Sequence, residues 1–157
     1  MSRIVIDPAD LETISRHGEA SYPEECCGFL IGHSSGEATV VERVLPVENE
    51  RQDSRHNRYV IHPETVLAAH KEARALGRDV VGYYHSHPDH PARPSEFDRE
   101  HAWPGLSYVI VAVEGGRAAE ARSWRLSDDR ERFEEEAIEQ TVGPAGPSME
   151  IQKEAVS

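Results

Sequence analysis

The sequence is poor in cysteine and in long apolar stretches. Its 157 residues include two cysteines, the neighbours Cys26 and Cys27. A bridge between adjacent cysteines would be strained, which excludes a disulfide framework and leaves both thiols reduced. The longest apolar runs, 28–32 and 108–113, fall far below the roughly 20 residues that cross a bilayer, so a membrane protein is excluded. We see no secretory signal after Met1 and expect a cytoplasmic protein.

Positive charge is also scarce. The chain has 17 Lys+Arg against 29 Asp+Glu, a net charge of −12, and its lysines are Lys71 and Lys153. Such a field repels nucleic-acid phosphates and anionic lipids, so we expect neither nucleic acid nor membrane as a partner. The length predicts one domain, placed at residues 1–142. Residues 143–157 lack periodicity and apolar density, which predicts a flexible tail.

The remaining sequence alternates between helical and extended patterns. We expect helices at 11–20 (capped by Asp7), 63–76, 95–102 and 128–141. Short apolar or β-branched runs predict strands at 26–32, 39–47, 58–62, 80–87, 106–113 and 118–126. A hairpin turn at 114–116 makes the last two strands antiparallel, so the predicted fold is an α/β, single-domain layered sandwich with a mixed, curved sheet flanked by helices.

Three of the nine histidines, His85, His87 and His90, fall within six positions, where the fourth predicted strand runs into a proline-rich stretch. His85 and His87 are two apart on that strand, so both imidazoles project from one face while Ser86 points away. A short helix packed against the strand end could return the Asp98 carboxylate to the same point. Two nitrogens and one oxygen, with a fourth position left for water, form the donor set of catalytic zinc.

Each half of this pattern has a simpler interpretation. A His-Ser-His pair alone is more often a surface or hydrogen-bonding feature than a metal site. The stretch from Ser95 to Asp98 alone is a helix start, with Ser95 as N-cap. The combination of both at this spacing, after a buried strand and with a glutamate upstream, is what predicts a functional site.

These residues resemble the zinc motif of the JAMM (MPN-plus) metallopeptidases. His85 and His87, a seven-residue spacer, Ser95 and Asp98 match that motif without substitution. Upstream, the stretch 23–32 is similar to the family's Glu-x-Cys-Gly strand start. The resemblance covers residues 4–138 and implies a JAMM/MPN fold, similar to that of the cytidine deaminases.

The resemblance also implies roles for individual residues. It selects Glu25, rather than Glu24, as the general base that later protonates the leaving amine. One zinc ion per chain would be held by the two histidines and Asp98, with water as the fourth ligand, and would acidify that water and polarise the carbonyl. The Ser95 hydroxyl would stabilise the oxyanion. His101 is a candidate to support the ligands, and His90 is expected to be solvated.

Other zinc and nucleophile chemistries do not fit. Nucleobase deaminases pair His-x-Glu with Pro-Cys-x-x-Cys, and zincins carry His-Glu-x-x-His; the sequence contains neither Pro-Cys-x-x-Cys nor His-Glu-x-x-His. The serine-hydrolase pattern Gly-x-Ser-x-Gly occurs at 32–36, but there it lies between two predicted strands and not between a strand and a helix. A thiol mechanism would need a histidine partner for Cys26 or Cys27. We expect both thiols to pack in the core instead.

The family resemblance leaves three functions open. Members hydrolyse bonds after the C-terminal glycines of ubiquitin-like proteins, and the chain's compactness favours a peptidase that processes a ubiquitin-like or sulfur-carrier protein. An isopeptidase that removes such a protein from lysine, or a non-catalytic MPN binding module, are the alternatives. We expect the Gly-Gly tail to add as a strand to a sheet edge, which the sequence does not identify. The oligomeric state is not predicted.

Overall fold

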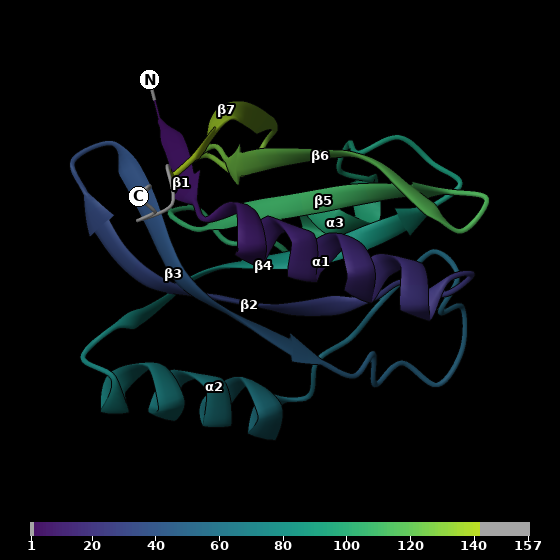
Figure 1. Cartoon of the computed structure of the whole chain (residues 1–157), viewed down its shortest axis with the longest axis horizontal. Helices are drawn as coiled ribbons and strands as arrows, with labels where there is room; N and C mark the ends of the chain where they lie inside the picture. The colour runs from purple at the N-terminus through teal and green to yellow at the C-terminus, as the bar shows by residue number, and fades with distance from the viewer. Residues whose placement is uncertain (1, 142–157) are drawn as a thin grey trace, which may run out of the picture.

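Figure 1 shows a computed structural model of the chain, which describes residues 2–141. The strands are β1 (Arg3–Ile6), β2 (Cys27–Ser35), β3 (Ala38–Val47), β4 (Asp79–Pro88), β5 (Ser107–Glu114), β6 (Arg117–Leu126) and β7 (Phe133–Gln140). The helices are α1 (Pro8–Ser21), α2 (Pro63–Ala75) and α3 (Glu96–His101). The predicted tail, 143–157, lies outside the described residues.

The strands form one mixed sheet in the order β1-β3-β2-β4-β5-β6-β7, and β1 also pairs with β7. The pairs β1–β3, β1–β7 and β4–β5 are parallel, and the remaining neighbours are antiparallel. The predicted α/β class and mixed, curved sheet are confirmed. The curvature goes further than expected, because the sheet closes into a barrel.

Helices α1, α2 and α3 lie where the sequence predicts them. Helix α1 begins at Pro8, and the carboxylate of its N-cap Asp7 accepts a hydrogen bond of 2.7 Å from the backbone N–H of Ala9. Helix α2 also starts with proline, and Gly77, which follows its C-terminal end, has a φ of 71° that glycine adopts without strain.

The expected helix at 128–141 is wrong, because this segment forms β7. Its residues pair with β6 in antiparallel fashion through Phe133 and with β1 in parallel fashion through Ile138. The spacing of Phe133, Ala137 and Ile138 suits one face of a helix. Local spacing contains no information about the second neighbouring strand that β1 pairs with. Strand β1 was not predicted, since four residues carry little periodicity.

The expected strand at 58–62 is wrong, because no strand of the structure includes these residues. The segment is extended and hydrogen-bonds along one side to Asn49 and Glu50, but it joins no ladder of the sheet. Its β-branched and aromatic composition therefore predicted the conformation of the backbone and not membership of the sheet.

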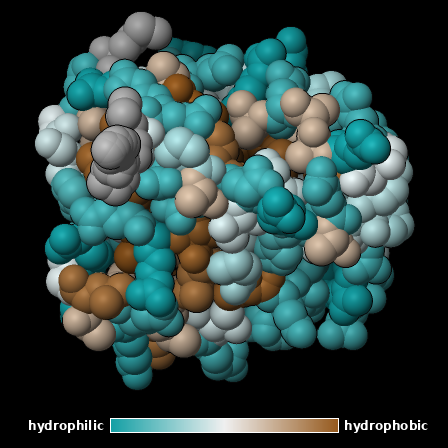
Figure 2. Space-filling model, in the orientation of Figure 1, coloured by the Kyte–Doolittle hydropathy of each residue, from teal (hydrophilic) through white to brown (hydrophobic). Residues whose placement is uncertain are grey.

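Two apolar clusters hold the helices to the sheet. Helix α1 lies across β3 to β6, as Figure 1 shows, and Ile14 packs there with Ile4, Leu30 and Val111. Helix α2 packs Ala69 and Ala73 against β2 and β4. On the face drawn in Figure 2, hydrophilic residues form most of the outer layer. Among residues 2–141, no helix combines the length and apolar content that crossing a bilayer requires.

Candidate metal centre

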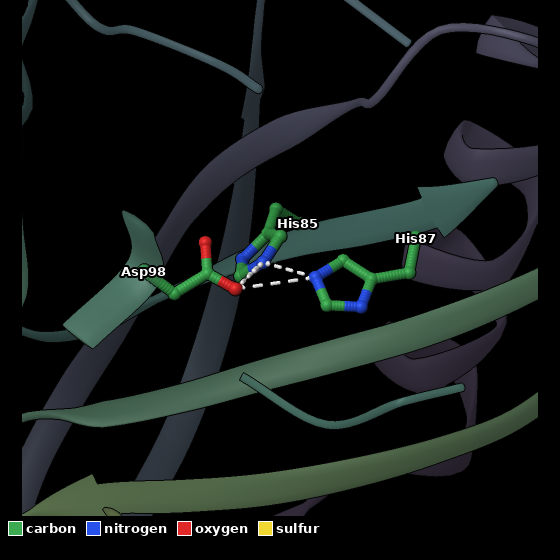
Figure 3. A group of neighbouring side chains, drawn as sticks. All are labelled: His85, His87 and Asp98. Carbon is green, nitrogen blue, oxygen red and sulfur yellow. Dashed lines mark hydrogen bonds and ion pairs between the residues drawn. The ribbon is translucent and has the colours of Figure 1, made fainter. Parts of the chain in front are cut away.

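The structure brings together the three side chains that the sequence predicts as metal ligands. His85 and His87 project from one face of β4, and Asp98 reaches the same point from α3, as Figure 3 shows. Both histidines are buried, with relative exposures of 2% and 7%. Their grouping with Asp98 is one that could hold a metal ion.

The distances between the donor atoms fit a tetrahedral ion. Nε2 of His85 and Nε2 of His87 are 3.1 Å apart, and each lies 3.3 and 3.2 Å, respectively, from Oδ2 of Asp98. Around zinc, with ligand distances of about 2.0 to 2.1 Å, tetrahedral donor atoms lie about 3.3 Å apart. The triangle leaves one tetrahedral position without a protein ligand, as in catalytic zinc sites.

The orientation of His87 also suits a ligand. Its Nδ1 lies 2.8 Å from the carbonyl oxygen of Pro91, which can only accept, so Nδ1 donates to that oxygen and Nε2 is the nitrogen that faces His85 and Asp98. His85 differs, because its buried Nδ1 has no hydrogen-bond partner among the described residues. The proline-rich loop thus orients one of the two imidazoles through a backbone carbonyl.

Asp98 has a second role at the start of α3. Its Oδ2 accepts a hydrogen bond of 2.9 Å from the backbone N–H of Ser95, and the Ser95 hydroxyl accepts one of 3.0 Å from the backbone N–H of Asp98. Burial alone would raise the pKa of Asp98. The nearby His85 and the hydrogen bonds from His85, His87 and Ser95 outweigh it and hold that pKa well below its usual range. Asp98 is therefore ionised, as a metal ligand must be.

The hydroxyl of Ser95 remains available to a substrate. It accepts the capping hydrogen bond through a lone pair, so its own proton is free to be donated. Ser95 is exposed to solvent. A helix cap and an oxyanion donor are therefore compatible uses of the same hydroxyl.

Glu25 lies two residues before the start of β2, and its environment distinguishes it from Glu24. Glu24 is exposed, whereas Glu25 is 4% exposed and its Oε1 has no hydrogen-bond partner within residues 2–141. Burial, and then the negative charge of Asp98, raise the pKa of Glu25 to about 9. A buried carboxyl that shares a field with the candidate ligands is suited to exchanging a proton at that site.

Ser86 braces the start of β2 from the opposite face of β4. Its hydroxyl accepts a hydrogen bond of 2.8 Å from the backbone N–H of Cys26, and its own N–H donates to the Cys26 carbonyl at 3.2 Å. The register of the two strands pairs Cys27 with His85. This brace therefore fixes Glu25, one residue before Cys26, relative to the histidines.

Two residues at the site escaped the sequence prediction. The ring of Tyr59 lies 4.9 Å from that of His85 at an interplanar angle of 31°, and the Pro91 carbonyl orients His87. Tyr59 could have been suspected as an aromatic residue in an apolar run. The contact with Pro91 could not be predicted, because every residue has a backbone carbonyl and the residue type therefore does not indicate it.

Among residues 2–141, neither remaining histidine side chain of the segment bonds to a candidate ligand, although the backbone N–H of His90 donates to the carbonyl oxygen of His87 at 3.5 Å. His90 is exposed, as expected. His101 packs its ring 4.2 Å from that of Phe97, and its Nδ1 lies 2.9 Å from the Phe97 carbonyl oxygen. Cys26 and Cys27 are buried free thiols, and burial raises both pKa values, which agrees with a packing role.

Comparisons with known proteins identify the family of the chain. A family model described as prokaryotic homologs of the JAB domain matches residues 8–127. The chain is 37% identical over 119 residues to a desampylase of Haloferax volcanii, covering 74% of this chain and 82% of that protein. It is 34% identical over 108 residues to a probable TtuB-protein conjugate cleaving protease of Thermus thermophilus, covering 69% of each.

Solved structures show the same fold. A protein of Desulfitobacterium hafniense superposes with a TM-score of 0.74 at 31% identity, over 90% of this chain and 97% of that one. A JAB1/MPN domain protein of Archaeoglobus fulgidus superposes with a TM-score of 0.51 at 20% identity, over 88% and 100% of the two chains. The described residues therefore adopt a JAB1/MPN fold.

Proposed function

The chain belongs to the family of prokaryotic homologs of the JAB domain and is a hydrolytic enzyme of the JAMM type, and we propose that it uses zinc to cleave the amide bond that follows the C-terminal glycines of a ubiquitin-like or sulfur-carrier protein. The observation that carries this proposal is the triangle formed by His85, His87 and Asp98, whose size and donor set suit one zinc ion per chain. The catalytic domain is proposed to span residues 1–142. Free thiols at Cys26 and Cys27 support a reducing, cytoplasmic location.

In the proposed mechanism each polar side chain has one task. His85, His87 and Asp98 would hold the ion. Zinc, when bound, supplies a Lewis acid that polarises the scissile carbonyl and acidifies water. Glu25 takes a proton from the attacking water and returns it to the leaving amine, and its buried position keeps bulk water from competing for that proton. Ser95 donates its free hydroxyl proton to the developing oxyanion.

The extended segment 58–62 offers the edge to which the substrate tail would add. Along one side of this segment, backbone groups form hydrogen bonds with Asn49 and Glu50. These groups include both the N–H and the C=O of Val60. The N–H and C=O groups of Tyr59 and Ile61 have no hydrogen-bond partner among the described residues, and alternation along an extended segment would direct them to the opposite side. An extended Gly-Gly tail could pair with these groups next to His85.

The leaving group is the open part of the proposal. One candidate leaving group is a linear C-terminal extension of the carrier. The names of the two relatives, a desampylase and a conjugate cleaving protease, favour release of a carrier from a protein conjugate. Both reactions use the same acyl side of the bond and the same residues.

Intact mass spectrometry of two substrates tests the proposal. One substrate is a sulfur-carrier protein extended beyond its Gly-Gly end, and the other is the same carrier linked to a lysine side chain. We expect zinc-dependent loss of the added group that a chelator blocks. Glu25→Gln should keep zinc but lower the rate by about 10² to 10⁴-fold, whereas Glu24→Gln should cleave normally.

Metal content provides the second readout. Asp98→Asn removes a ligand charge and should lose both zinc and activity. A zinc-loaded, folded protein that changes neither substrate would contradict the proposed reaction. A Glu25→Gln protein with full activity would contradict the role of Glu25 alone.

A further inference from the structure

A cavity lined by aromatic and aliphatic side chains opens beside the metal centre. Its volume is about 200 Å³, and His85 and Asp98 form part of its wall. Six of the chain's ten aromatic residues line it: Tyr59, Tyr83, Phe97, Trp103, Tyr108 and Phe133. Pockets that hold whole small molecules measure roughly 300 to 1,000 Å³, so this one suits a single large side chain.

Two unpaired arginines lie over the aromatic walls of this cavity. The guanidinium carbon of Arg58 is 4.5 Å from the ring centre of Phe97, and that of Arg130 is 5.0 Å from the ring centre of Trp103. Neither has a carboxylate partner within the described part of the chain. A guanidinium stacked on a ring keeps its edge N–H groups free for a carboxylate.

These cations stand out against the charge of the whole protein. The net charge is −12, and most other arginines with stacked or partly buried side chains, such as Arg51, Arg99 and Arg125, do have a carboxylate partner. Trp103, beneath Arg130, is 63% exposed, which is unusual for a large aromatic residue. An apolar cavity with two free cations beside it is complementary to an apolar, acidic ligand.

Resting on the proposed function, we propose that this cavity receives a large apolar side chain of the carrier's C-terminal tail, and that Arg58 and Arg130 pair with a carboxylate about two residues away in the same tail. Tyr59 and Ile61 line the cavity with their side chains and carry the unpaired backbone groups described above. A tail paired with them would direct alternate side chains toward the cavity and its cations. The enzyme would thus prefer acidic tails and reject basic ones.

Binding of product peptides tests this preference without requiring hydrolysis. Four labelled peptides end in Gly-Gly: one carries leucine and aspartate two residues apart, and the others replace aspartate by asparagine, aspartate by lysine, or leucine by alanine. The leucine position is scanned along the tail. Fluorescence anisotropy on the zinc-loaded full chain should show that the aspartate peptide binds about tenfold more tightly than the lysine peptide. The alanine peptide should also bind more weakly.

Charge reversal locates the effect. Arg58→Glu and Arg130→Glu should each abolish or invert the preference for aspartate over lysine. Arg117→Glu makes the same charge change in the exposed hairpin after β5, at another arginine with no carboxylate partner among residues 2–141, and should keep the preference. Circular dichroism melting identifies any variant that fails to fold, and Arg58→Gln then serves as the milder replacement.

The outcomes separate this inference from the proposed reaction. Equal binding of the aspartate and lysine peptides at every position, or an equal response to Arg117→Glu and Arg58→Glu, would overturn the inference even if the carrier is cleaved. The predicted preference in a protein that cleaves no carrier would support the cavity's specificity while contradicting the proposed reaction.

Discussion

Replacing Ser86 by alanine should destabilise the protein and impair catalysis without removing a metal ligand. The Ser86 hydroxyl is fully buried and accepts a hydrogen bond of 2.8 Å from the backbone N–H of Cys26. No other described group accepts a hydrogen bond from this N–H. Alanine leaves this N–H buried and unpaired, since Cys26 is 2% exposed. Such a loss costs about 1 to 3 kcal/mol of unfolding free energy. In a domain of this size that lowers the melting temperature by about 2 to 12 °C.

The catalytic effect follows from the position of the brace. Cys26 connects Glu25 to β2, so weakening its bond to β4 lets the Glu25 carboxyl drift from His85 and His87. We expect kcat to fall while zinc content stays at the wild-type level, because neither histidine changes. Differential scanning calorimetry, metal analysis and carrier cleavage measure the three quantities.

A matched control makes this test decisive. Ser34→Ala makes the same chemical change near the exposed end of β2, where we expect less than about 0.5 kcal/mol. If Ser86→Ala melts within a degree of Ser34→Ala and retains full activity, the hydrogen bond between β2 and β4 neither stabilises the fold nor positions Glu25. The reasoning from the buried N–H would then be refuted.

Two further predictions concern the interior around the site. In metal-free protein, burial and the charge of Asp98 raise the pKa of Glu25 to about 9. The folded state therefore keeps the Glu25 proton at pH values at which the unfolded state, where the pKa of this carboxyl is 4.5, has released it. The unfolding free energy should therefore fall by up to ~1.4 kcal/mol per pH unit as the pH rises from about 5 to 9. Urea titrations across this range should show that Glu25→Gln removes this slope, and an unchanged slope would assign it to other groups. Gly28→Ala should cost about 1 to 3 kcal/mol, because its Cβ would lie 2.2 Å from Cε2 of Tyr84, a buried ring whose hydroxyl is 2.6 Å from Nδ1 of His17. Thermal melting measures that cost, and NMR titration should show the pKa of His17, which burial lowers, returning toward its ordinary value.

The candidate metal site was accessible from sequence because its geometry is local. The strand period alone places His85 and His87 on one face, and the capping pattern from Ser95 to Asp98 places a helix start after the proline-rich stretch. The return of Asp98 to the histidines was open to inference from the short helix that follows the strand, and the family resemblance strengthened it, since the path of the loop between them is not encoded in a period. The packing of Tyr59 on His85 joins segments 26 residues apart, and nothing in either segment indicates it.

The closure of the sheet into a barrel could not be predicted from local sequence patterns, because it also depends on partners distant in sequence. The spacing of Phe133, Ala137 and Ile138 is compatible with a helix as well as with strand β7. Backbone hydrogen bonding to β1 and β6 decides in favour of the strand. Glu136 shows the same dependence on distant partners. It is buried because Ser123 and Arg125 of β6 bind its carboxylate, and a sequence window around Glu136 shows only a charged stretch.

The pairing of β1 with β7 has a consequence for how the protein is made. Ile4 pairs with Ile138, so its partner is synthesised 138 − 4 = 134 residues later. At about 5 to 20 residues per second, β1 waits about 7 to 27 s on the ribosome before its second neighbour exists. Until then the barrel has an open seam, although His85, His87 and Asp98 are already present in the nascent chain. Closing the seam is thus a late event, and sequence-distant pairing of this kind makes it a slow step in maturation.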